Sequence, residues 1–195
     1  AETVAALGDL IRSGKIRYIG ISNFRGWQIA EIARECAAQG VPRPVICQPY
    51  YNLLNRMPEV EILPACDYFG LGVAPYSPIA RGVLTGKYTS EGEVPEDSRG
   101  ARKDQRLMET EFRAESFAIA RMLKAHAEKS GRSPTAFALA WLWANRIISS
   151  VIAGPRTLAQ WRDYLGAIGA QWSEEDEALV DSLVRPGHPS TPGYS

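Results

Sequence analysis

The fold of this chain is decided by a short apolar run, IRYIGIS at residues 16–22, which ends in polar residues just before a segment of helical periodicity. Three later runs repeat the arrangement: VICQ at 45–48, LGVAPY at 71–76 and SSVIA at 149–153. Short continuous apolar runs are typical of parallel strands covered on both sides. Strands that alternate with helices pair in parallel through right-handed crossovers. The sequence therefore predicts an α/β fold built from parallel β/α units.

Helical periodicity covers much of the remaining chain. We expect helices at residues 2–13, between the SN pair at 22–23 and residue 40, and at 58–69, 111–129, 134–145, 157–168 and 174–184. Ser133 before Pro134 predicts an N-cap followed by proline at the first helical position. Ser173 with Asp176 predicts a capping box at the last helix.

Two segments interrupt this pattern. Residues 89–106 are polar and rich in charge, and they predict a long loop, a feature that is usually functional or mobile. Residues 185–195 hold three prolines and two glycines and predict a loose tail. We therefore expect one domain over residues 1–184, since a chain of 195 residues can bury a full core.

Composition argues against several classes of function. The chain has 22 basic and 22 acidic residues, so no net field draws it to nucleic acid or to a membrane. No apolar run approaches the roughly 18 residues that a membrane span needs. Cys36, Cys47 and Cys66 lie in apolar segments without metal-ligand spacing, so we expect buried thiols, no metal site and a cytoplasmic location. His126 and His188 are expected at the surface, outside any nucleophile pair.

Polar or turn residues follow every predicted strand. They are Ser22 with Asn23, Gln48, Tyr76 with Ser77, and Gly154. In parallel α/β folds, ligands meet the strands at their carboxyl ends. We expect these side chains to share one rim of the sheet, although Ser22 and Asn23 are also open to interpretation as an ordinary helix N-cap.

Four motifs in this order resemble those of the aldo-keto reductases. They are GKIRYIGISNF at 14–24, QPYYN at 48–52, YSPIARGVLTGKY at 76–88, and IAGPRT at 152–157 with Gln160. They are similar to the family's signatures around strands 5 to 8. The family fold is a (β/α)8 barrel, and its members reduce aldehydes and ketones with a nicotinamide cofactor, usually NADPH. The resemblance implies that this chain begins after strand 4 and forms the second half of a (β/α)8 TIM-type barrel, ending in extra C-terminal helices.

The resemblance also implies a cofactor site along the four strand ends. Ser22, Asn23 and Gln48 would bind the nicotinamide carboxamide, and Tyr76 would stack on the nicotinamide ring. Residues that would wrap the pyrophosphate or meet its charge are Ser77, Pro78, Ile79, Gly82, Leu84, Lys87 and Arg99. Residues that would hold the adenosine end are Gly154, Arg156, Gln160 and Asp163, where the Arg156 guanidinium suits the 2′-phosphate of NADP.

One departure concerns the residue after Asp163. The family often has an Asn there to contact adenine, whereas this chain has Tyr164. Tyr164 is open to two interpretations, as a ring stacked on adenine or as a core residue. NADP is favoured over NAD only by Arg156 and by the habit of the family.

The family's catalytic tetrad of Asp, Tyr, Lys and His has no matching position here, so no catalytic residue is assigned. Three interpretations remain open: part of a whole reductase acting on a small carbonyl substrate, a non-catalytic nucleotide-binding module, or an interaction subunit that self-associates through the open half-barrel. The first is favoured by an N-terminal residue, Ala1, that is not Met.

Overall fold

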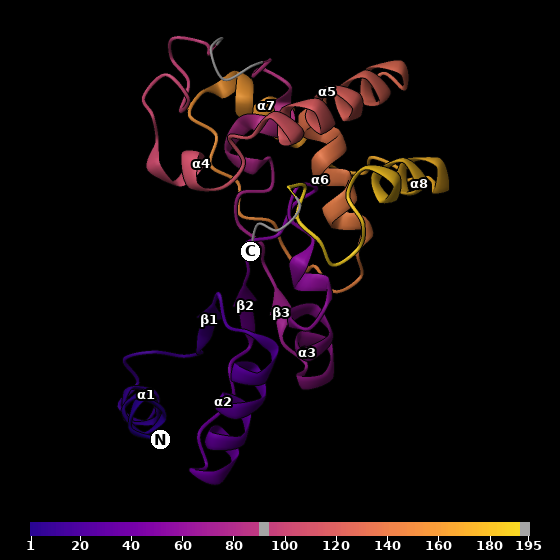
Figure 1. The fold of residues 1–195 in the computed structure, drawn as a ribbon. Helices are drawn as coiled ribbons and strands as arrows, with labels where there is room; N and C mark the ends of the chain where they lie inside the picture. Colours follow the sequence, from indigo (N-terminus) through magenta and orange to yellow (C-terminus); the bar gives the residue numbers. More distant parts are fainter. Residues whose placement is uncertain (90–93, 192–195) are drawn as a thin grey trace.

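The computed structural model describes residues 1–89 and 94–191. Its elements alternate as predicted, so the α/β class with parallel strands is confirmed (Figure 1). In chain order they are α1 Glu2–Arg12, β1 Gly20–Ser22, α2 Gly26–Ala38, β2 Ile46–Gln48, the 3-10 helix η1 Met57–Glu59, α3 Ile62–Phe69, β3 Gly72–Val73, the 3-10 helix η2 Ala80–Thr85, α4 Gln105–Glu109, α5 Ala114–Lys129, α6 Pro134–Ala144, α7 Leu158–Leu165 and α8 Glu174–Leu183.

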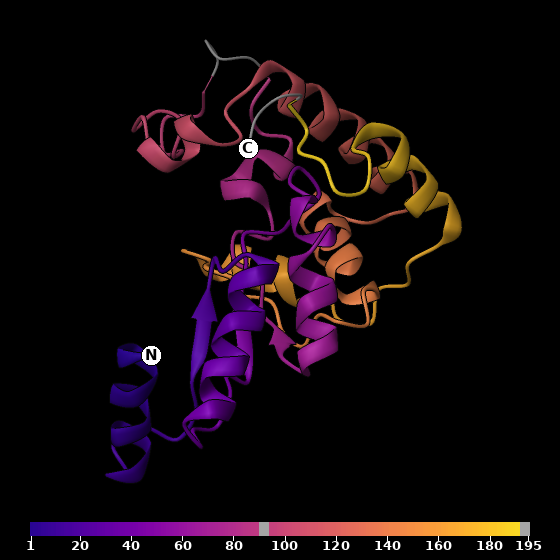
Figure 2. The ribbon, with the colours of Figure 1, turned by 60° about the horizontal axis from the view of Figure 1, so that its bottom comes forward.

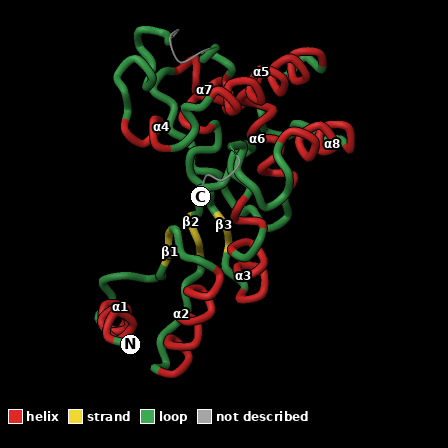
Figure 3. Tube along the Cα trace, in the orientation of Figure 1, coloured by secondary structure: helices red, strands yellow, loops and turns green. Residues whose placement is uncertain are grey.

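The three strands form one parallel sheet in the order β1-β2-β3 (Figure 3). Ile21 pairs with Cys47, and Cys47 pairs with Val73. These three side chains are buried, whereas Gly20 and Ser22, their neighbours on β1, are exposed. Because side chains alternate between the faces of a strand, one face of the sheet is packed and the other is open.

The prediction of a fourth strand at residues 149–153 is wrong, because the segment does not form a strand. The segment runs parallel to β3 but touches the sheet only through isolated bridges at Ile148 and Ile152. The backbone N–H groups of Gly72, Ala74 and Tyr76 donate to carbonyls in and around β2. The N–H positions between them, at residues 73 and 75, face the segment at 148–152. Pro75 occupies one of those intervening positions and has no N–H, so a continuous ladder cannot form there.

Helices α2 and α3 cover the packed face of the sheet (Figures 1 and 2). Ile29 and Cys36 of α2 are fully buried, as are Cys66 of α3 and Cys47 of β2. The three thiols are free and buried as expected. This packing fixes the carboxyl ends of the strands, and with them the rim where ligands bind.

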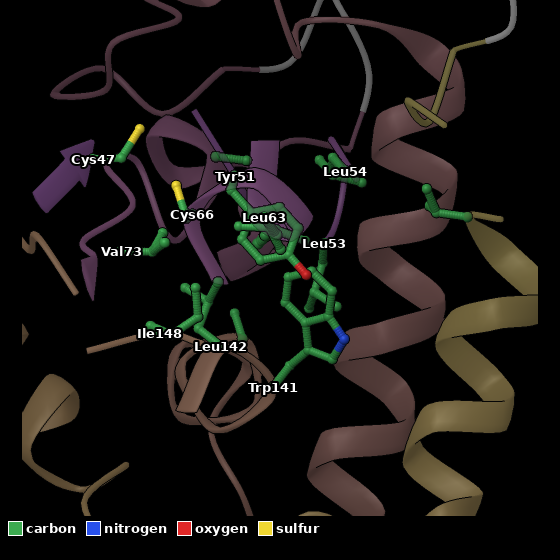
Figure 4. Packing of buried hydrophobic residues seen from close by; sticks show 14 of the residues in the cluster. Cys47, Tyr51, Leu53, Leu54, Leu63, Cys66, Val73, Trp141, Leu142 and Ile148 are labelled. Atoms are coloured by element: carbon green, nitrogen blue, oxygen red, sulfur yellow. The ribbon is translucent and has the colours of Figure 1, made fainter. Parts of the chain in front are cut away.

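The helix α6 is buried around most of its circumference, as its apolar sequence predicts. Its N-cap, Ser133, accepts a hydrogen bond from the Ala136 amide at 3.0 Å. The Trp141 ring lies 4.8 Å from the Tyr51 ring, measured between centroids, and both are in the core (Figure 4). Trp143 faces outward and is 40% exposed.

Two expectations about the C-terminal half need correction or addition. His126 is half-buried: its side chain is 20% exposed, and its Nε2 lies 2.7 Å from the buried carboxylate of Asp176 on α8, whereas His188 is exposed. Within the predicted tail, the backbone carbonyl of His188 accepts a hydrogen bond from the Arg56 amide, and the Ser190 amide donates to the backbone carbonyl of Leu54. The described part of the tail is therefore held against the loop after β2, while the boundary at residue 184 stays a prediction.

The long loop was predicted at residues 89–106, and residues 90–93 of it lie outside the described residues. Its last two residues belong to α4, whose N-cap is Asp104. No helix among the described residues combines the length and the apolar character needed to cross a membrane. In the same part of the chain, no cluster of three or more His, Cys, Asp and Glu side chains suits a metal ion.

Candidate functional site

The candidate site is a cavity of about 420 Å³ beyond the carboxyl end of β3. Its walls come from the segment after β3, the loop before α4, the start of α6 and the segment that leads into α7. The cavity brings together most of the residues predicted for the cofactor: Tyr76, Ser77, Pro78, Ile79, Gly82, Lys87, Arg99, Gly154, Arg156, Gln160 and Asp163.

The segment after β3 has an unusual backbone. Ser77, Ala80 and Arg81 have φ angles of 56°, 48° and 52°, and Gly82 has a φ of 100°. Left-handed conformations at residues other than glycine are sparsely populated and cluster at ligand-binding segments. A Cβ on Gly82 would lie 2.9 Å from the Lys87 ammonium, so glycine allows this cation to approach the backbone. The Ala80 and Gly82 amides donate to the Ser77 and Ile79 carbonyls, which holds the segment in this tight turn.

One end of the cavity is formed by Tyr76. Its hydroxyl donates to the side-chain oxygen of Asn23 at 3.1 Å, and its ring lies 5.4 Å from the Tyr50 ring. Asn23 has a φ of 56° and stands outside α2, whose N-cap is Arg25, so the helix-cap interpretation of Ser22 and Asn23 is wrong.

The remaining predicted residues do not line this cavity. The Ser22 hydroxyl donates to the backbone carbonyl of Gln48 at 2.9 Å, where the ends of β1 and β2 lie side by side. These two residues therefore lie beside each other on the same rim, and Asn23 connects that rim to the cavity through Tyr76. Leu84 is 2% exposed, and its side chain packs in the core.

Four cations contribute to the cavity wall: Arg81, Lys87, Arg99 and Arg156. Arg81 is paired with the buried carboxylate of Glu111 at 3.0 Å, which leaves Lys87, Arg99 and Arg156 for a ligand. The Arg99 guanidinium pairs with Asp104 at 3.2 Å, and Arg156 donates to the Asp97 carbonyl at 3.1 Å. These contacts are exposed, so they compete weakly with a ligand. The cavity is therefore suited to an anion that carries several charges.

The far end of the cavity is formed by the start of α6 and by α7. The Asp163 carboxylate accepts from the hydroxyl of Ser133, the α6 N-cap, and the Gln160 side chain accepts from the Arg156 amide at 2.7 Å. Tyr164 is 8% exposed yet lines the cavity, and burial raises the pKa of its hydroxyl. Tyr164 thus belongs both to the core and to the site.

The prediction omitted several lining residues: Arg81, Thr85, Pro134, Thr135 and Ile152. Arg81 and Thr85 lie inside the motif at 76–88, so that motif was a usable signal for them. Pro134 and Thr135 have no local signal, because only tertiary packing brings α6 to the cavity.

Comparisons with known proteins agree with these motifs. A model described as the aldo/keto reductase family matches residues 1–185. Over its whole length the chain is 34% identical to the "Uncharacterized oxidoreductase YrpG" of Bacillus subtilis, covering 57% of that protein. It is 31% identical to the "L-glyceraldehyde 3-phosphate reductase" of Escherichia coli O157:H7 over 95% of the chain and 54% of the relative.

A third relative is the "Aflatoxin B1 aldehyde reductase member 2" of Rattus norvegicus, which is 33% identical over 85% of the chain and 49% of the relative. The chain spans about half the length of the curated relatives it matches. That coverage and the open parallel sheet are consistent with part of a (β/α)8 barrel.

Proposed function

Since the chain belongs to the aldo/keto reductase family of oxidoreductases, we propose that the cavity beyond β3 binds NADPH for the reduction of a small carbonyl compound. The observation that carries the proposal is the gathering of four cations around the left-handed segment after β3, with an aromatic ring at each end of the cavity. A dinucleotide carries its phosphates between two ring systems, so its charge pattern matches this wall.

At the nicotinamide end, Tyr76 is oriented by Asn23 and offers its ring for stacking. The carboxamide has one acceptor and two donors, which Ser22, Asn23 and Gln48 complement. The Ser22 hydroxyl already donates to the Gln48 carbonyl, so its free lone pairs remain available as acceptors. Held in this way, one face of the nicotinamide is covered and the other is left for the carbonyl substrate.

The phosphates would meet the backbone of residues 77–82 together with Lys87 and Arg99. Arg156 would bind the 2′-phosphate, because a guanidinium matches phosphate geometry with two parallel hydrogen bonds. The Gln160 amide nitrogen and the Tyr164 ring lie beside it in the wall and would contact the adenosine. This arrangement favours NADP over NAD.

The cofactor supplies the hydride when it is bound, and the residues described here bind and orient it. No residue of this chain is assigned to the catalytic proton transfer, so we propose that the chain carries most of the cofactor site and that the tetrad lies outside it. The three buried, free thiols favour a reducing cytoplasm as the location.

A fluorescence titration of the chain with NADPH tests the cofactor proposal. We expect saturable binding that NADP⁺ displaces. Gly82→Val should weaken binding about tenfold or more, because a β-branched residue is disfavoured at positive φ and would displace Lys87. The matched control is Gly14→Val, since Gly14 also has a positive φ but has open space around it far from the cavity. Absence of saturable binding, or equal losses in both variants, would reject the proposal.

A second proposal concerns partners, and it rests on the unpaired sides of the sheet. Among the described residues, β1 pairs only with β2, and the segment at 148–152 contacts the sheet only on the β3 side. Beside that segment, α7 and the residues just after it expose an apolar stripe formed by Leu158, Trp161, Leu165 and Ile168. Unpaired edges next to an exposed apolar face are typical of interaction surfaces. We propose that these surfaces allow self-association, in which a second copy of this chain covers them.

Light scattering after size exclusion tests the second-copy form of this proposal. We expect a dimer that Trp161→Glu and Leu165→Glu together convert to a monomer, because two charges would be buried in the interface. Tyr68→Glu, at an exposed position on α3, should leave the dimer intact. A monomer at every concentration would exclude self-association.

A further inference from the structure

The left-handed segment after β3 is held in place by the side chain of Arg81. Arg81 has a φ of 52°, so its own backbone is in a sparsely populated conformation. Its side chain is 11% exposed, and its Nη1 donates to the Thr110 hydroxyl at 2.9 Å and lies 3.0 Å from Glu111 Oε2. The same nitrogen donates to the Tyr50 hydroxyl at 3.2 Å. Strained conformations persist where the surroundings over-determine them, so these contacts stabilise the shape of the segment.

Two of these acceptors belong to the stretch of chain that also carries Arg99. Asp104 pairs with Arg99 at 3.2 Å and is the N-cap of α4. Thr110 is the C-cap of the same helix, and Glu111 follows it directly. A helix of five residues therefore connects the carboxylate that pairs with Arg99 to the carboxylate that pairs with Arg81.

This stretch is anchored in the core at both ends. Phe112, next to Glu111, is 8% exposed, and its ring lies 5.5 Å from the Tyr88 ring, measured between centroids. The Tyr88 hydroxyl accepts a hydrogen bond from the Gly100 amide at 3.2 Å. A Cβ on Gly100 would lie 2.9 Å from the Tyr88 ring and 3.2 Å from the Phe112 ring, so the backbone beside Arg99 packs closely on both. The same aromatic contacts therefore position Arg99 and Glu111.

We propose that Arg81 and Glu111 form a positioning pair for the cofactor, which holds the left-handed segment and the loop carrying Arg99 at the spacing at which both bind the diphosphate. The proposal rests on the proposed function, because it concerns the same cavity. Glu111 contacts no cofactor atom in this account and acts through Arg81. Groups that are fixed before binding lose less freedom when the ligand arrives, so a site organised in this way binds more tightly.

The sign of one substitution separates this role from a simple effect of charge. As part of a positioning pair, Glu111 strengthens the binding of a polyanion, whereas a negative charge beside the cavity would weaken it. Glu111→Gln keeps the shape and removes the charge. We expect the NADPH dissociation constant to rise about five- to tenfold in a fluorescence titration. An unchanged or lower constant would overturn the proposal.

The matched control is Glu59→Gln, which makes the same change in another ion pair with low exposure. Glu59 Oε1 lies 2.8 Å from Arg56 Nε, and neither residue lines the cavity. Glu59→Gln should lower stability but change the NADPH dissociation constant by less than about twofold. A loss of NADPH affinity as large as that of Glu111→Gln would show a general effect of damaged packing and would overturn the proposal.

Two further variants test whether Glu111 acts through Arg81. Arg81→Met should raise the NADPH dissociation constant about tenfold or more, and adding Glu111→Gln to it should raise the constant by no more than about twofold again. Losses that multiply would show that the two residues act independently, which would contradict the proposal. Thr110→Val removes an uncharged acceptor of Arg81, so it should weaken NADPH about threefold without any change of charge.

Amide hydrogen exchange of the full chain without cofactor tests the positioning directly. The amides of Gly82 and Asp104 donate to the Ile79 and Arg99 carbonyls, one in each of the two segments. In Glu111→Gln both should exchange about tenfold faster, whereas amides of α2 should keep their rates. Unchanged exchange at both positions, or equal acceleration throughout the chain, would overturn the proposal. Absence of NADPH binding by the unaltered chain would instead reject the proposed function, and the exchange rates distinguish the two failures.

Discussion

Replacement of Arg56 by alanine is expected to lower the free energy of unfolding by about 3 to 5 kcal/mol, the largest effect on stability that we predict. Arg56 is 4% exposed and joins three parts of the chain. It pairs with Glu59 at 2.8 Å and with Asp181 of α8 at 2.6 Å, and it donates to the Val184 carbonyl at 3.0 Å. Alanine would leave Glu59 without its cation and would release the end of α8.

Urea denaturation at neutral pH measures this loss. The matched control is Arg146→Ala, which breaks a pair of similar geometry with Asp67 at 2.7 Å, but one in which Arg146 is 77% exposed. Exposed pairs contribute little, so this control should cost less than about 1 kcal/mol. Losses of equal size in the two variants would contradict the account of Arg56 as the residue that anchors α8 and the segment after it.

Replacement of Arg156 by glutamine should change cofactor preference more than any other substitution considered. A hydrogen-bonded charge pair with the 2′-phosphate is worth about 1.5 to 3 kcal/mol, so the NADPH dissociation constant should rise about 10- to 100-fold. Binding of NADH, which has no 2′-phosphate, should change by less than about twofold. The variant would therefore lose its preference for the phosphorylated cofactor while keeping its ability to bind dinucleotides.

Arg162→Gln is the matched control for Arg156, because Arg162 is exposed on α7 and does not line the cavity. Its affinities for NADPH and NADH should equal those of the unaltered chain. If Arg156→Gln weakened NADPH and NADH by the same factor, Arg156 would be a general binding residue, and the preference for NADP would need another source.

Local chemistry made much of this fold predictable from the sequence. The Ser133 N-cap and the capping box of Ser173 with Asp176 both form as expected, because a cap depends on residues within one turn of the helix. The strand positions were predicted from apolar runs, but β3 is shorter than its run. The motif at 76–88 predicted most of the cavity wall, since one continuous segment after β3 supplies that part of it.

Long-range contacts account for what the sequence did not reveal. Pro75 interrupts pairing with a segment more than 70 residues later, and no local pattern indicates that its N–H would have faced that segment. His126 meets Asp176 across a separation of 50 residues, so this contact has no local signature. Arg81 and Glu111 are 30 residues apart, and only the fold joins them into a buried ion pair.

A crystal structure of the chain with NADP⁺ tests the central claim most directly. We predict the nicotinamide ring stacked on Tyr76 with its carboxamide at Asn23, the diphosphate along residues 77–82, and the 2′-phosphate within hydrogen-bond distance of Arg156. A dinucleotide bound elsewhere, or lying in this cavity in the opposite direction, would contradict the account.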